Sequence, residues 1–185
     1  MSDLLIRAFP GDLALRSDGR TVVGLACPWG EVARVRDGSG PAYDETFRRG
    51  AFARTITERG DRVKVYANHS HRQGASPIGK AVRLTETDAG LEAELRISAT
   101  AAGDEALQLV RDGALDSLSV GFSPLRTVRE GGRTVRTEVA LGEISLVPYG
   151  AYDGARVMAV RSADFPWLTD AERRLDLLRL SLEIQ

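Results

Sequence analysis

Cysteine and histidine are scarce in this chain, and long apolar runs are absent. Cys27 is the only cysteine among 185 residues, so no internal disulfide can form. We expect it to serve as a small buried hydrophobe. No apolar run approaches the length of a membrane span. The N-terminal segment, residues 1–7, is too short and too polar for a signal peptide. We therefore expect a cytoplasmic protein that does not bind a membrane.

An excess of charge of one sign is also missing. The net charge is -1, and the basic residues, which are arginines except for Lys64 and Lys80, form no block. This distribution lacks the electrostatic footprint of a nucleic-acid-binding protein. The hydrophobic content of 43% is ordinary for a globular protein, and the length fits one domain with a short extension.

Short strands dominate the hydrophobic pattern. Predicted strands cover residues 4–9, 21–28, 63–69, 78–86, 91–98, 115–122, 125–128, 134–139 and 139–147. Helices are predicted over residues 46–59, with the helix proper starting near Gly50, over 101–111, and in a final segment opened by a capping box at Thr169. Regular alternation of strands and helices is absent. We therefore expect an α+β fold, mainly an antiparallel β-barrel surrounded by a few helices, in residues 1–162, with a helical extension over 163–185.

The predicted strand 115–122 contains a serine beside a glycine. Apolar residues alternate along one face of this strand, so Ser117, Ser119 and Gly121 share the other face. Glycine within a strand often marks the close approach of a ligand or of another backbone. Ser119 is therefore our candidate nucleophile, with Gly121 leaving room beside it. The alternative is an ordinary polar position with the glycine at a bulge.

A serine nucleophile needs a group that accepts its proton, and the chain has two histidines, His69 and His71. His69 is the better candidate because it is predicted to end a strand, whereas His71 lies in a polar loop. Glu143 lies inside an apolar strand, where a carboxylate is costly unless it is paired. We expect Leu141 and Ser145 to share its face. Glu143 could orient the imidazole, or it could pair with one of the many arginines.

A metal site and an α/β-hydrolase site are two alternatives to this serine site. His69 and His71 could bind a metal on one strand face, but residues 72–76 contain no acid and no third histidine exists. The sequence around Ser119 lacks the first glycine of the G-x-S-x-G motif typical of α/β-hydrolases.

Several short motifs in a fixed order resemble one known family. They are F-R-R-G-A-F (47–52), Y-A-N-H-S (66–70), P-I-G-K (77–80), D-A-G-L (88–91), L-S-V-G-F (118–122) and E-I-S-L-V (143–147). Over roughly residues 20–160 the chain resembles the prohead proteases of HK97-like tailed phages. After the last motif the family usually continues with a P-A-N-like turn, whereas this chain has P-Y-G-A-Y.

The resemblance implies a serine endopeptidase whose barrel is distantly related to that of the herpesvirus assembly proteases. It implies that His69 is the general base, Ser119 the nucleophile and Glu143 the third catalytic residue. It also implies that the enzyme works inside the procapsid in the host bacterial cytoplasm. There it would cleave the scaffold or the scaffolding segment of the major capsid protein, and in some cases itself.

We expect no cofactor and no metal, and we leave a homodimer open. The second hypothesis is a catalytically inactive capsid-assembly or scaffolding protein with the same barrel. The third is a metal-binding β-barrel.

Overall fold

A computed structural model describes residues 4–9, 13–70 and 74–148. His71, the predicted domain boundary at residue 162 and the predicted C-terminal helix lie outside the described residues. The elements are β1 (Leu5–Phe9), β2 (Ala14–Leu15), β3 (Thr21–Pro28), β4 (Ala33–Val35), β5 (Tyr43–Phe47), α1 (Ala53–Arg59), η1 (Gly60–Arg62), β6 (Lys64–Ala67), β7 (Gly79–Glu86), β8 (Gly90–Ile97), α2 (Ala101–Arg111), β9 (Ser117–Glu130) and β10 (Arg133–Val147). None of the helices in this part of the chain is long and apolar enough to cross a membrane.

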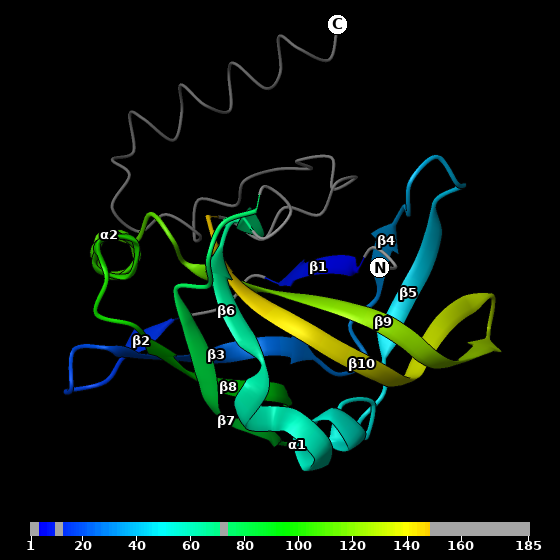
Figure 1. The fold of residues 1–185 in the computed structure, drawn as a ribbon. Helices are drawn as coiled ribbons and strands as arrows, with labels where there is room; N and C mark the ends of the chain where they lie inside the picture. The colour runs from blue at the N-terminus through cyan, green and yellow to red at the C-terminus, as the bar shows by residue number, and fades with distance from the viewer. Residues whose placement is uncertain (1–3, 10–12, 71–73, 149–185) are drawn as a thin grey trace, which may run out of the picture. The chain divides into compact units, whose positions relative to one another are not determined.

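One curled sheet contains all ten strands of the described chain, in the order β1-β9-β10-β6-β7-β8-β3-β2, with β5 also pairing β10 and β4 pairing β5 (Figure 1). The sheet curls far enough for β3 to approach both β1 and β9. Most neighbouring strands are antiparallel, whereas β5 and β6 both run parallel to β10. The helix α1 packs against β10 and β7. The predicted fold class, an α+β fold that is mainly an antiparallel β-barrel with a few helices, is therefore confirmed, with the barrel present as this curled sheet.

Most of the predicted boundaries agree with the structure, but β9 and β10 are longer than predicted. Each is one continuous strand where the sequence predicted two. Pro124 favoured a break, because proline cannot donate to a sheet ladder. In the structure Pro124 lies opposite Val139, whose N–H donates to the carbonyl of Ala51 and whose carbonyl accepts from the Thr55 hydroxyl. The backbone N–H and C=O of Val139 therefore both point away from β9. Because this pair is not hydrogen-bonded, the missing N–H of Pro124 removes no hydrogen bond between β9 and β10.

The interior of the sheet is apolar and rich in phenylalanine. Phe47 stacks on Phe52 with ring centroids 5.7 Å apart and meets Phe122 edge to face at 5.2 Å. Cys27 is fully buried in this core, and burial raises the pKa of its thiol well above the usual value. A protonated, enclosed thiol is not a nucleophile, so the expected role as a buried hydrophobe is consistent with the structure.

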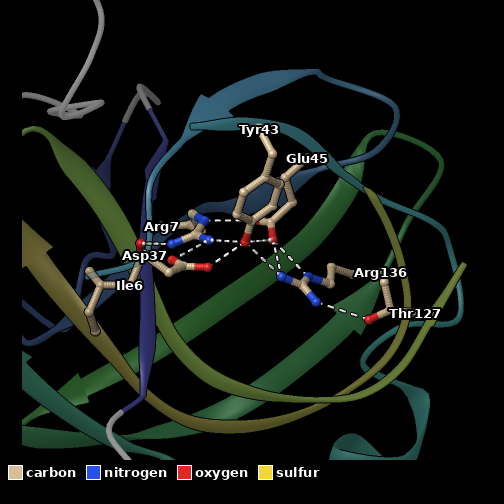
Figure 2. A network of polar contacts seen from close by, with 7 residues as sticks. All are labelled: Ile6, Arg7, Asp37, Tyr43, Glu45, Thr127 and Arg136. Atoms are coloured by element: carbon tan, nitrogen blue, oxygen red, sulfur yellow. Dashed lines mark hydrogen bonds and ion pairs between the residues drawn. The ribbon is translucent and has the colours of Figure 1, made fainter. Parts of the chain in front are cut away.

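A buried polar network crosses the interior beside this core (Figure 2). Glu45 of β5 is 1% exposed and accepts hydrogen bonds from Arg7 of β1 and from Nε of Arg136 of β10, the latter at 2.7 Å. The Tyr43 hydroxyl accepts from Arg136 Nη2 at 2.9 Å and donates to Asp37. The burial of Tyr43 and its hydrogen bond to Asp37 raise its pKa to about 12. Arg136 Nη1 also donates to the Thr127 hydroxyl of β9 at 2.9 Å, so the network joins four strands and the loop that precedes β5 (Figure 2). The sequence did not predict this network.

Substituting Glu45 with glutamine would leave Arg7 and Arg136 buried with their charges poorly compensated. We expect the Glu45→Gln variant to lose about 3–5 kcal/mol in the free energy of unfolding, measured by urea denaturation. Glu58→Gln is the matched control, because it removes an exposed ion pair with Arg54. If Glu45→Gln were no more destabilising than Glu58→Gln, the buried network would not stabilise the fold.

Candidate active site

The register between β9 and β10 puts the candidate residues on one face. Ser119 lies directly opposite Ser145, and Gly121 lies opposite Glu143. Side chains at directly opposed positions of an antiparallel pair point to the same face. Two short segments, 119–121 of β9 and 143–145 of β10, thus bring Ser119, Glu143 and Ser145 into one polar cluster beside Gly121, on the face of these strands that turns away from the apolar core.

A β-bulge at Gly142 decides which face Glu143 occupies. Leu141 pairs with Phe122 and Glu143 pairs with the next residue, Gly121, so Gly142 is an extra residue in β10. Leu141 therefore points into the core, where it is fully buried together with Ile144. The expectation that Leu141 shares the face of Glu143 is wrong, because a bulge shifts the alternation by one residue. Ser145 does share that face.

His69 comes from the turn that follows β6. This strand runs parallel to β10, with Ala67 opposite Leu146, and the Asn68 N–H donates to the Leu146 carbonyl at 2.9 Å. Asn68 and His69 both have a φ of 52°, in the left-handed region that few non-glycine residues adopt. The sequence predicted that His69 would end the strand. Instead β6 ends at Ala67, and His69 lies in a strained turn of the kind that clusters at functional sites.

The imidazole of His69 contacts the carboxylate of Glu143. Nδ1 of the ring lies 2.7 Å from Oε1, and the Glu143 side chain is 3% exposed. The other carboxylate oxygen, Oε2, accepts a hydrogen bond from the Ser145 hydroxyl at 2.6 Å. Glu143 therefore pairs with the histidine rather than with an arginine. An ionised carboxylate at Nδ1 favours the tautomer with its proton on Nδ1, which puts the lone pair of the ring on Nε2.

Gly121 leaves space that the Glu143 carboxylate fills. A Cβ atom at this position would lie 2.4 Å from Oε1, far inside van der Waals contact. The sequence indicated that Gly121 makes room for a neighbour, and the structure identifies that neighbour as Glu143.

Ser119 is completely buried and its hydroxyl forms no hydrogen bond in the structure. Its neighbours across the sheet are Ser145 on β10 and Ala8 on β1. Among the described side chains, one other buried polar atom, Thr46 Oγ1, shares this condition. Buried hydroxyls almost always have a partner, so an unpaired one calls for an explanation. The structure thus brings His69 and Glu143 into contact and puts Ser119 on the same face, without a hydrogen bond from Ser119 to His69.

Ser145 is the residue of this cluster that the sequence analysis did not assign to the site. The signal was present, because in the segment E-I-S the first and third residues lie on one strand face. Within the described ranges, no group of three or more histidine, cysteine, aspartate or glutamate side chains could hold a metal ion.

Comparisons with known proteins identify the family. The sequence profile of the Caudovirus prohead serine proteases matches residues 12–165, and the chain belongs to this family. The resemblance inferred from the short motifs is confirmed.

Two individual proteins are similar to this chain. The prohead protease of Enterobacteria phage HK97 is 29% identical over 119 residues, which are 62% of this chain and 52% of that protein. The chain thus matches about half the length of this curated relative. The structure of the capsid assembly protease of bacteriophage T4 matches with a TM-score of 0.57 and 12% identity. That match covers 78% of this chain and 97% of the other, and at this identity it shows a common fold.

Adding a methyl group at Gly121 tests the packing of the cluster. We expect Gly121→Ala to push the Glu143 carboxylate away from Nδ1 of His69, visible in a crystal structure of the variant. We also expect it to lower the free energy of unfolding by about 1–3 kcal/mol, as overpacking does. The control is Gly60→Ala, because Gly60 has open space around it and a helical φ of -54°. An unchanged His69–Glu143 contact in Gly121→Ala would contradict this account of the glycine.

Proposed function

We propose that this protein is a serine endopeptidase of phage head maturation, with Ser119 as nucleophile, His69 as general base and Glu143 as the third catalytic residue. Its substrate is the scaffold or the scaffolding segment of the major capsid protein inside the procapsid, and it also cleaves itself. The observation that carries the proposal is the contact between His69 and Glu143 on the face that holds Ser119, in a chain of the prohead protease family.

The proposed chemistry gives each of the three side chains one role. Oγ of Ser119 attacks the carbonyl carbon of the scissile peptide bond while Nε2 of His69 accepts the hydroxyl proton. Glu143 stabilises the imidazolium through Nδ1 and remains ionised. The imidazolium then gives its proton to the leaving amine, and an acyl-enzyme forms on Ser119. Water, activated by His69, hydrolyses the ester and restores the serine.

The burial of Ser119 sets a condition on this cycle. Its side chain has no exposed surface, so a peptide reaches Oγ only after the groups that cover it have moved. Hydrogen bonds between nucleophile and base are often long or absent before substrate binds and shorten in the complex. We therefore assign the described conformation to the resting enzyme, in which the His69–Glu143 pair is already formed.

The test uses a serine-reactive phosphonate and a co-expressed capsid precursor. Wild-type protein is expected to be labelled at Ser119 and to cut the precursor at defined termini that mass spectrometry identifies. Ser119→Ala, His69→Ala and Glu143→Gln are each expected to lower the rate of cleavage by about 10⁴-fold or more.

Ser117→Ala is the matched control for these variants. Ser117 lies on the same strand and is also buried, at 3% exposure, but its hydroxyl donates to Asp116 outside the cluster. We expect its labelling and cleavage to match those of the wild type. Cleavage that persists in Ser119→Ala would refute the mechanism. A wild-type protein that assembles with capsid protein and neither reacts nor cleaves would support the inactive assembly protein instead.

A further inference from the structure

Ser145 has two hydrogen bonds that connect both partners of the His69–Glu143 pair. Its hydroxyl donates to Oε2 of Glu143 at 2.6 Å and accepts from the backbone N–H of His69 at 3.3 Å. The residue is completely buried and lies directly opposite Ser119 in the β9–β10 ladder. One hydroxyl thus holds the carboxylate from one side and the backbone of the histidine from the other.

We infer that Ser145 is a positioning residue of the protease, which fixes the Glu143 carboxylate so that Oε1 faces Nδ1 of His69. The inference rests on the proposed function of the site. It adds a fourth residue, one that acts through Glu143 and His69 and does not touch the substrate.

The physical reason lies in the freedom of a glutamate side chain. The last torsion of glutamate is broad, so a carboxylate held through one oxygen alone can turn about it. The hydrogen bond from Ser145 to Oε2 removes this freedom and directs Oε1 at the ring. With Oε1 fixed, the proton of the neutral imidazole stays on Nδ1, and Nε2 keeps the lone pair that the mechanism requires. Without it, we expect part of the population to carry the proton on Nε2, which cannot act as the base.

The bond between Ser145 and the backbone of His69 supports the same geometry. His69 follows Asn68 in a turn where both residues have a φ of 52°. Such a strained turn persists because surrounding contacts hold it. The His69 N–H bond to Ser145 and the Asn68 N–H bond to Leu146 are two contacts of this kind.

The experiment compares Ser145→Ala and Ser145→Cys with the wild type. Alanine removes the hydroxyl, whereas cysteine keeps the shape of the side chain with a slightly larger atom and replaces the hydroxyl by a much weaker donor. Both are expected to lower kcat by about 10- to 100-fold, the cost typical of removing an outer hydrogen-bond partner of a functional ligand, while KM stays within about twofold. If circular dichroism shows that Ser145→Ala is unfolded, the kcat of Ser145→Cys tests the positioning role.

A second readout reports on the histidine itself. Nitrogen-15 NMR of ¹⁵N-histidine-labelled protein distinguishes the two tautomers, and the chain has two histidines, so His69→Gln assigns the signals. In the Ser119→Ala background, which prevents self-cleavage, we expect the proton of neutral His69 on Nδ1. Adding Ser145→Ala or Ser145→Cys is expected to give a mixture of the two tautomers. The matched control is Ser117→Ala in the same Ser119→Ala background, without a change at Ser145. We expect this control to keep the proton of neutral His69 on Nδ1.

The two readouts separate this inference from the proposed function. Loss of kcat together with a mixed tautomer in the Ser145 variants supports the positioning role. An unchanged tautomer, or an unchanged kcat, in a folded Ser145 variant overturns it, even where Ser119→Ala has shown that the mechanism is correct. Conversely, persistent cleavage in Ser119→Ala overturns the mechanism, while the tautomer still reports whether Ser145 orients Glu143.

Discussion

The site depends on the pairing between β9 and β10 and on the β-bulge at Gly142, one of three register shifts in this ladder. Without the bulge, Leu141 and Glu143 would point to the same face, so either the carboxylate would enter the apolar core, where an ionised carboxylate is costly, or Leu141 would leave it. With the bulge, Glu143 lies on the face of Ser119 and Ser145 while Leu141 is buried in the core. The parallel pairing of β6 with β10 then brings the following turn, which carries His69, to the same carboxylate.

Polar side chains are buried in two separate parts of the structure for different purposes. The network around Glu45 satisfies its own charges, since two guanidinium groups enclose one carboxylate and a tyrosine hydroxyl joins them to Asp37. Such an arrangement stabilises strands against each other without leaving a reactive group. The cluster around Glu143 is arranged otherwise. Its carboxylate is satisfied, but the neighbouring hydroxyl of Ser119 is left without a hydrogen bond.

The sequence predicted those features that depend on local alternation. The strand Thr21–Pro28, the helix Ala101–Arg111 and the common face of Ser119 and Gly121 all follow from short-range periodicity. The face of Leu141 and the continuity of β9 through Pro124 were mispredicted. Both depend on the partner strand, because a bulge and a non-hydrogen-bonded pair are properties of the ladder and not of either strand alone. The Glu45 network was missed for the same reason, since its arginines come from strands that are distant in sequence.

The central claim is that β6, β9 and β10 place one serine, one histidine and one glutamate at a single reactive point. A crystal structure of the protein after reaction with a serine-directed phosphonate tests it most directly. The account predicts a covalent bond from Oγ of Ser119 to phosphorus, with Nε2 of His69 within about 3 Å of an oxygen on that phosphorus and Nδ1 still bonded to Glu143. Phosphorus bound to another side chain, or an imidazole directed away from the adduct, would contradict it.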